Sequence, residues 1–547
     1  SNVGPEIDPK DIDYLEVQRG GLSAEEGDRT YGVFNVVPRS GFDRNRQAEL
    51  VASYGGQQTT NDQLSFGSHT QRLGYFASLT GYRSDAGLEP PAPQLLHDET
   101  AGGGGFTSVI YNASPSDQIR IVGSARADHY QVPNSPDDQA AGIRDLDNER
   151  DAFAIATWVH TASANLLFTV SPFYHFNRAD YVGGAGDFPL TPQDRRRSDY
   201  IGVHATAAYS RGRNQARAGV DLFGERQHEQ IAIAFHDGSS PDLSAQQDAG
   251  GNVGAFFAED QFRASNWLTL NAGVRLTRYS GLVTEYAADP RLGAAFTLPR
   301  LGWVLRGFYG HYYQAPPLSS ASSSLSGFAA NQGLGFLPLH GERDRQYEAG
   351  LGIPVRQWTF DFSAFQTSAH NFFDHDVLGN SNIFFPLTID QARIRGLEAA
   401  VRSAQIAQLV QLHLAYSHQF AQARGAVTGG LSDFSALESR GWFYLDHDQR
   451  NTLSVGARSS LPLRAWISAN VTYGSGFLDG DGPAHLGPHT SVDLALGKPF
   501  GENWSVTLNA LNLANSRYLL DNSNTFGGTH WSYPRQVAVQ VRYTFHY

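Results

Sequence analysis

The last twelve residues constrain the fold more than any other part of the chain. They read QVAVQVRYTFHY, and their apolar and polar residues alternate up to the final position. Side chains at alternate positions of an extended strand point to opposite faces, so this segment predicts a strand with one apolar face. That face carries Val537, Val539, Val541, Tyr543, Phe545 and Tyr547.

A strand of this kind at the end of a chain needs a partner, because a bare apolar edge invites pairing with other chains. A barrel supplies the partner by pairing its last strand with its first. A barrel with an apolar outside and a polar lumen gives this alternation in a membrane. We therefore predict a membrane barrel, and the edge of a soluble β-sandwich is the alternative.

The same alternation recurs along the chain. Residues 268–277 read LTLNAGVRLT, with leucine, alanine and valine on one face and threonine, asparagine and arginine on the other. Residues 467–473 and 360–364 alternate in the same way. The first of these runs spans ten residues, and a tilted strand needs about nine to eleven residues to cross a bilayer.

The connections between these runs differ in length in a regular manner. Short turns are predicted at 114–118, 212–214, 265–267, 299–302, 354–357, 405–408, 462–463 and 501–503. Long connections rich in Gly, Pro and Asp are predicted at 87–105, 133–148, 183–197, 234–250, 316–341, 374–390, 422–448, 478–488 and 521–533. Short turns at one end and long loops at the other are typical of outer-membrane barrels, and the runs from Gln47 onward predict about 22 strands.

Composition narrows the class further. The 547 residues include no cysteine, so disulfides and thiol chemistry are excluded, and a net charge of −13 argues against a nucleic-acid partner. No apolar run is long enough for a transmembrane helix, and no signal peptide stands at Ser1. The chain also lacks methionine, so we expect that its first residue is not the native start.

Residues 1–42 differ in pattern from the rest of the chain. They contain two short strand-like runs, at 11–21 and 31–41, each ending near glycine. Two small strands have no core of their own and must pack on something else. We therefore predict two parts, 1–42 and a transmembrane barrel over 43–547.

Several segments resemble the TonB-dependent outer-membrane transporters. Residues 12–20, IDYLEVQRG, and 32–41, GVFNVVPRSG, resemble the end of that family's plug domain. Short motifs resemble its barrel landmarks: PRLG at 290–293, YEAG at 347–350, RGLE at 395–398, DQRN at 448–451, NALNLANSRY at 509–518 and YPR at 533–535. Each motif is weak alone, but their order and spacing together carry the resemblance.

The resemblance implies an all-β, up-and-down barrel of 22 strands with a plug in its lumen, in the outer membrane of a Gram-negative-type envelope. It implies uptake of a scarce nutrient (a siderophore, a cobalamin-like chelate, a saccharide or a peptide) with energy delivered through TonB and its inner-membrane motor. Outer-membrane lipid and lipopolysaccharide would surround the wall. No cofactor is expected.

One departure from the family concerns the plug. The family's plug is much longer than residues 1–42 and follows a TonB box, and no box can be named here. We expect the chain to be a fragment of a longer transporter. The alternative is a structural barrel subunit of a larger envelope assembly, with other envelope proteins as partners, and a passive porin comes third.

The resemblance also implies a latch between plug and wall, in which plug arginine meets wall glutamate. By motif position the latch residues are Arg19, Glu348 and Glu398. Charged groups inside a barrel are costly unless they are paired. The alternative interpretation is that each is an ordinary lumen charge in water.

Candidate substrate contacts fall in two places. The run His370–Asp376, HNFFDHD, gathers His370, Asp374, His375 and Asp376, which would suit a metal-carrying substrate. A polar loop at an aromatic girdle is the interpretation that we favour for this run.

Tyr312 and Tyr313 precede two prolines, and we expect them in the girdle rather than in a ligand platform. Residues 195–197, three arginines, could meet lipopolysaccharide or form a solvated loop base. No HExxH, GxSxG or P-loop pattern is present, so we expect no enzyme.

Overall fold

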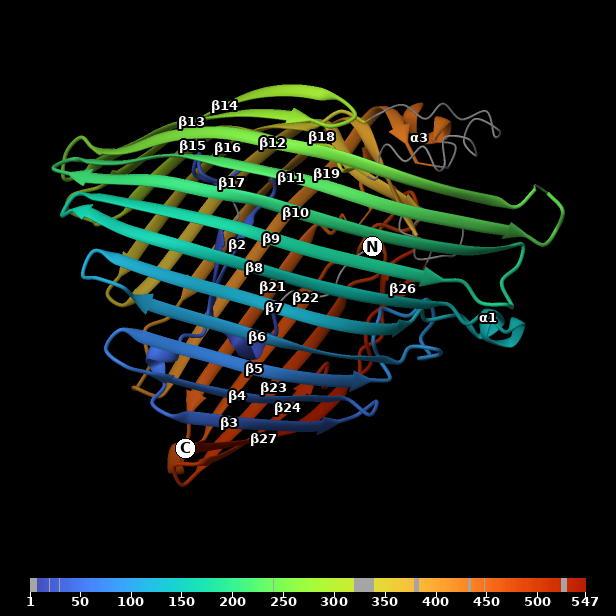
Figure 1. Ribbon diagram of the computed structural model, residues 1–547, viewed down its shortest axis with the longest axis horizontal. Coiled ribbons are helices and arrows are strands. Elements are labelled where there is room, and N and C mark those ends of the chain that lie inside the picture. Colours follow the sequence, from blue (N-terminus) through green and yellow to red (C-terminus); the bar gives the residue numbers. More distant parts are fainter. Residues whose placement is uncertain are drawn as a thin grey trace.

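The computed structural model describes residues 7–547 apart from 19, 29, 240, 319–338, 378–382, 431–433, 447 and 523–528. Over the described residues, 22 strands form one closed antiparallel barrel (Figure 1). In chain order they are β3 Gln47–Gly55, β4 Thr60–His69, β5 Leu73–Ser84, β6 Thr100–Asn112, β7 Asp117–Gln131, β8 Leu146–Ser163, β9 Leu166–Val182, β10 Leu190–Arg211, β11 Asn214–Phe235, β12 Leu243–Arg263, β13 Leu268–Ser280, β14 Thr284–Thr297, β15 Val304–Gln314, β16 Glu342–Val355, β17 Trp358–Val377, β18 Phe384–Arg402, β19 Val410–Gly429, β21 Asn451–Ser460, β22 Trp466–Gly474, β23 His489–Phe500, β24 Trp504–Leu511 and β27 Gln536–His546. The predicted fold class is confirmed.

The terminal strand closes the barrel as its alternation predicts. β27 pairs antiparallel with β3, and Val541 lies opposite Ala52. The backbone N–H of Tyr547 donates to the carbonyl of Arg46 at 2.9 Å, so the pairing continues to the last residue. Closure removes both sheet edges, which explains how an apolar strand can end the chain.

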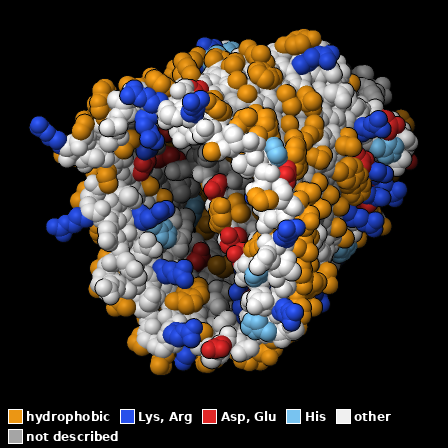
Figure 2. All heavy atoms as spheres, turned by 60° about the vertical axis from the view of Figure 1, so that its left-hand side comes forward, with side chains coloured by type: hydrophobic (Ala, Val, Ile, Leu, Met, Phe, Trp, Pro, Cys, Tyr) orange, Lys and Arg blue, Asp and Glu red, His pale blue; other side chains and the backbone are white. Residues whose placement is uncertain are grey.

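The two faces of the wall have opposite character. On β13 and β14, Leu276 and Leu292 are about half exposed on the outside, whereas Arg275 and Arg291 are buried inside. Figure 2 shows apolar side chains over much of the outer wall and charged side chains around a hollow. Apolar surface therefore faces lipid and the charges face the lumen.

Connections are short at one end of the barrel, the turn end, and mostly long at the other, the loop end. In Figure 1 the turn end lies on the left, where β10 passes into β11. The predicted asymmetry is confirmed, although the β3–β4 and β13–β14 connections at the loop end are short.

Strand lengths correct part of the prediction. β10 and β11 each have 22 residues, so they extend well beyond a bilayer. The predicted loops at 183–197 and 234–250 are therefore partly strand, and the three arginines at 195–197 lie within β10 rather than in a loop. Above the membrane both faces of a strand meet water, so the apolar alternation that marks a strand disappears there.

Smaller elements lie in the connections between the barrel strands. They are α1 Pro136–Ala141, α3 Ser435–Glu438, β20 Phe443–Tyr444, β25 Leu519–Asp521, β26 His530–Trp531 and the 3-10 turn η4 Pro462–Arg464. Among the described residues, no helix has both the length and the apolar character needed to span a membrane.

Residues 7–46 stand apart from the barrel sheet. The 3-10 turns η1 Pro9–Asp11 and η2 Gly41–Asp43 flank the strands β1 Ile12–Gln18 and β2 Val33–Pro38. These two strands pair only with each other in the described chain and form an inner hairpin, which lies inside the barrel (Figure 1). Asp11 accepts a hydrogen bond from Gln63 of β4 at 3.0 Å.

Candidate functional site

The segment between β1 and β2, here called the hairpin loop (Gly20–Asp28), is held against the lumen side of the wall. The backbone N–H of Ala24 donates to Glu259 Oε2 on β12 at 2.7 Å. The backbone N–H of Leu22 donates to the Tyr312 hydroxyl oxygen on β15 at 3.2 Å. Since Asp11 contacts β4, which lies opposite β15 in the barrel order, the inner hairpin and its loop together cross the lumen.

Glu25 is the charged centre of this contact. Its carboxylate oxygen Oε1 lies 3.0 Å from His204 Nε2 on β10, and Oε2 is paired with Arg217 on β11. Burial alone would raise the pKa of Glu25, but the hydrogen bond from His204 and the charge of Arg217 outweigh it and lower the pKa. Glu25 is therefore ionised at neutral pH, and its carboxylate ties the hairpin loop to two strands.

Two wall arginines bind the backbone of the hairpin loop. Arg275 Nη1 on β13 donates to the Glu25 carbonyl at 2.8 Å, and its other terminal nitrogen lies 2.9 Å from Asp221. Arg291 on β14 donates to the Ser23 carbonyl, and its guanidinium lies 4.4 Å from the Tyr312 ring centroid. Both arginines are almost fully buried, so each needs these partners.

The glycine at position 27 leaves room for one of these two arginines. A Cβ added at Gly27 would lie 2.0 Å from Arg275 Nε, inside the guanidinium group. A side chain at this position would displace the Arg275 guanidinium from its contacts with Glu25 and Asp221. No sequence motif marks Gly27 for this role.

Just after the hairpin loop, Tyr31 meets an acidic residue of β16. The Tyr31 hydroxyl donates to Glu342 Oε1 at 2.6 Å, and Asp28 Oδ1 accepts from the Ala315 N–H at 2.7 Å. Glu342 and Asp344 are both buried within this part of the lumen. Sequence reasoning missed both, although their i, i+2 spacing on a barrel strand would have placed them on one face.

The structure describes only two of the three predicted latch residues. Arg19 lies outside the described residues. Glu348 is on β16 next to the hairpin loop, because a Cβ added at Gly20 would come 2.7 Å from Glu348 Oε2. Glu398 is on β18, where its Oε2 lies 3.5 Å from the Ser363 hydroxyl. The latch stays a prediction.

Tyr312 is not on the outer wall where a girdle residue would lie. It is buried in the lumen, between Arg291 and the N–H of Leu22. Tyr313 is also buried, and its hydroxyl donates to Glu285 Oε2 on β14 at 2.9 Å. The girdle interpretation of these two residues is therefore wrong, and Tyr312 contacts the hairpin loop.

The run His370–Asp376 is strand rather than loop. It forms the loop end of β17, and the expected loop is wrong there because the strand extends beyond the apolar band. His370 is exposed, whereas Asp376 is buried. Asp374 Oδ1 lies 3.6 Å from His375 Nδ1. Over the described residues, no group of three or more potential metal ligands is found.

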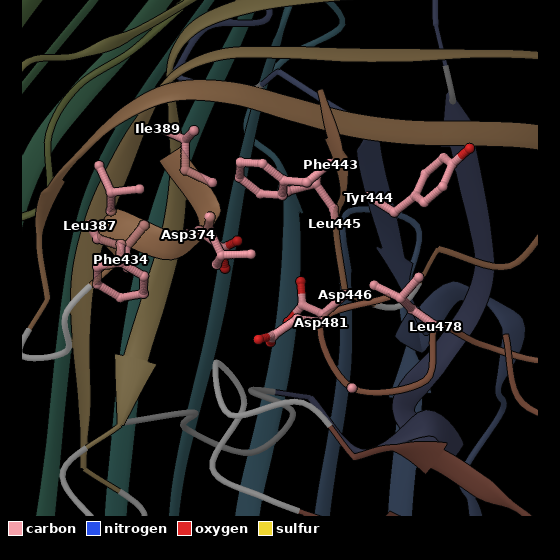
Figure 3. A pocket seen from close by; sticks show the side chains of 13 residues that line it. Asp374, Leu387, Ile389, Phe434, Phe443, Tyr444, Leu445, Asp446, Leu478 and Asp481 are labelled. Atoms are coloured by element: carbon pink, nitrogen blue, oxygen red, sulfur yellow. The ribbon is translucent and has the colours of Figure 1, made fainter. Parts of the chain in front are cut away.

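A small pocket at the loop end collects three carboxyl groups (Figure 3). Asp374 of β17 and the loop residues Asp446 and Asp481 line it together with apolar side chains, among them Phe443 and Leu445. Its volume is about 30 Å³, room for roughly one water molecule. Burial, with the charges of Asp374 and Asp521, raises the pKa of Asp446 to about 9.

The barrel sequence matches a protein-family model. Residues 131–513, well over half of the chain, match the β-barrel domain described as TonB dependent receptor-like. The chain belongs to the TonB-dependent receptor family. Membership places the barrel in the outer membrane of a Gram-negative cell, among proteins that take up ligands with TonB. No curated protein sequence matches the chain.

Solved structures of TonB-dependent receptors have the same fold. The ferric yersiniabactin uptake receptor FyuA from Yersinia pestis has a TM-score of 0.77 at 13% identity, covering 98% of this chain and 85% of its own. The copper transporter OprC has a TM-score of 0.75 at 13% identity, covering 99% and 87%. The FrpB iron transporter from Neisseria meningitidis has a TM-score of 0.75 at 13% identity, covering 98% and 88%.

Proposed function

We propose that this receptor takes up a metal chelate, of the siderophore or cobalamin-like kind, with energy delivered through TonB. The metal-bearing ligands in the names of its structural neighbours support this class. A saccharide or a peptide is the alternative substrate.

The observation that carries the proposal is the inner hairpin inside the barrel, whose hairpin loop is fastened to the wall. A passive pore or a purely structural barrel has no need of a segment fastened to its inner wall. The contacts of Glu25, Arg275 and Arg291 hold that segment against four strands on one side of the barrel, β10, β11, β13 and β14. Such a segment obstructs the lumen until its contacts are broken.

The chemistry of the contacts suits a reversible gate. They join charged and polar groups, which water can replace once the segment moves, instead of an apolar interface that would resist wetting. In the family, TonB pairs with its receptor as an added strand and pulls. We infer that this pull separates Glu25 from His204 and Arg217, and that the loop reseats afterwards because the wall charges stay in place.

The proposal is tested by uptake in cells. A strain lacking its own iron and cobalamin receptors would produce the complete receptor, with or without TonB. Radiolabelled ferric siderophores, cobalamin, an oligosaccharide and a peptide would be offered in turn. We expect one metal chelate to enter only when TonB is present. Uptake limited to the saccharide or the peptide would contradict the proposal, and so would equal uptake with and without TonB.

A further inference from the structure

The outer wall carries a groove that the uptake function does not use. It lies between β10 and β13 and has a volume of about 370 Å³. Ile201 and Leu222 form one side, whereas Asn252, Arg278 and Ser280 form the other. Ile201 and Leu222 are exposed, so the groove opens toward lipid and not into the lumen.

Two glycines on the outer face create the groove. Gly224 lies opposite Ile201 and Asn252, and Gly254 lies opposite Leu222 and Arg278. A Cβ added at Gly254 would meet only Leu222 Cδ2, at an ordinary contact distance of 3.5 Å. The backbone therefore does not require glycine at Gly254. Glycine inside a strand is costly and often marks a place that a ligand approaches closely.

The groove lies at the height where the wall changes from apolar to polar. Along the outer face of β11, the apolar residues end at Leu222 and Arg226 follows Gly224. Along β13, they end at Leu276 and Arg278 follows. The change occurs toward the loop end, which lies on the extracellular side in this type of barrel. The groove is therefore at the headgroup level of the outer leaflet.

The charge beside the groove is positive. Arg278 forms no ion pair with any residue that the structure describes. Arg226 lies opposite Asp199, but Asp199 already pairs with Arg197 at 3.0 Å and accepts from the Tyr174 hydroxyl at 2.6 Å. Against a chain charge of −13, this is a local excess of arginine.

The two arginine side chains are spaced for more than one phosphate. The strand register puts Arg226 and Arg278 two strands and four residues apart. With standard strand spacings, their Cα atoms are roughly 16 Å apart. Each arginine can grip one phosphate with two parallel hydrogen bonds.

We propose that this groove binds lipopolysaccharide of the outer leaflet. One phosphate of its diglucosamine head lies at Arg226 and the other at Arg278, while its acyl chains descend over Ile201, Leu222 and Leu276. The proposal rests on the wall alone and is independent of which nutrient the receptor transports.

The test is native mass spectrometry of the complete receptor, released from detergent with added lipid. The lipids are bisphosphorylated lipopolysaccharide lipid anchor, its monophosphorylated form and phosphatidylglycerol. The variants are Arg226→Gln with Arg278→Gln, and Gly254→Leu, which fills the groove. Matched controls are Arg345→Gln, an exposed arginine elsewhere on the outer face, and Gly307→Leu, whose added Cβ meets nothing within 4 Å.

We expect one bisphosphorylated lipid to remain bound to the parent and to both controls. Occupancy should fall at least several-fold in the double arginine variant and in Gly254→Leu. Heat-modifiable migration on a denaturing gel shows that each variant is folded. Equal occupancy in all folded variants, or equal retention of phosphatidylglycerol, would overturn the proposal and leave only unspecific boundary lipid.

Discussion

Glu25 Oε1 of the hairpin loop lies 3.0 Å from His204 Nε2 on the barrel wall, across 179 positions of sequence. This contact joins the segment inside the barrel to a strand of the wall that crosses the membrane. Arg217 forms an ion pair with the same carboxylate. The Glu25 side chain therefore connects the hairpin loop to two strands of the wall.

Replacing Glu25 with glutamine should loosen the hairpin loop without unfolding the barrel. The change removes the charge that His204 and Arg217 share, and a hydrogen bond to a charged group contributes about 1.5–3 kcal/mol. We expect more frequent channel openings of Glu25→Gln in planar bilayers than of the parent. Glu99→Gln, which breaks an exposed pair with Arg83 away from the hairpin loop, is the control and should behave as the parent.

Acidification should loosen the same contact. The folded pKa of Glu25 is lower than its ordinary value of 4.5, so its ionised form stabilises the seated state above pH 4.5. That contribution is lost as the pH falls through the lowered pKa. Openings should therefore increase below pH 4.5 in the parent and show a weaker dependence in Glu25→Gln. An identical pH profile in both proteins would refute this role.

Asp446 should have the opposite effect on the pH dependence of stability, because its pKa is raised rather than lowered. Its pKa is raised from 3.8 to about 9, so the folded protein keeps this carboxyl neutral at pH 7 while the unfolded chain ionises it. The resulting loss of folding stability is absent below pH 3.8 and grows as the pH rises toward 9. Asp446→Asn should raise the melting temperature by a few degrees at pH 7 and by much less near pH 4. Thermal scans at the two pH values measure the difference.

The latch predicts a coupling between Arg19 and Glu348. If the two side chains pair, Arg19→Gln and Glu348→Gln should each increase channel openings, and the double variant should add little to either. Glu398→Gln extends the cycle to the neighbouring candidate. Fully additive effects would show that Arg19 and Glu348 act separately.

Because the last strand, β27, closes the barrel, we predict that the barrel cannot form without it. Deleting residues 536–547 would expose edges on β24 and β3, both of which now pair with β27. We expect no heat-modifiable, membrane-inserted barrel from this deletion. Tyr547→Phe, which removes only a hydroxyl contact with Tyr75 at 3.0 Å, should insert normally.

The barrel was predictable from sequence because its signal is local. Alternation along a strand such as β27 or β13 depends only on which side of the wall each residue faces. The prediction was wrong where that reason stops applying: at residues 190–197 and 243–250 the strands rise above the membrane and lose the apolar face. The same effect made strand residues 370–376 resemble a loop.

The seating of the hairpin loop could not be predicted in this way. Leu22 and Tyr312 are 290 positions apart, and nothing near either residue indicates the other. Glu25 and Arg275 belong to no family motif used in the prediction, and the PRLG motif that contains Arg291 does not indicate a contact with the hairpin loop. The motif-based latch pointed to Arg19 and Glu348, whereas the described contacts are centred on Glu25.

A reversible disulfide lock tests the central claim that the hairpin loop gates uptake. A Cβ added at Gly273 on β13 would lie 3.0 Å from Ala24 Cβ, slightly shorter than the usual disulfide spacing. The chain has no cysteine, so Ala24→Cys with Gly273→Cys introduces the only pair, and each single variant is a control. We predict that the oxidised double variant loses TonB-dependent uptake and regains it on reduction. Uptake that continues with the disulfide formed would contradict the gating role of the hairpin loop.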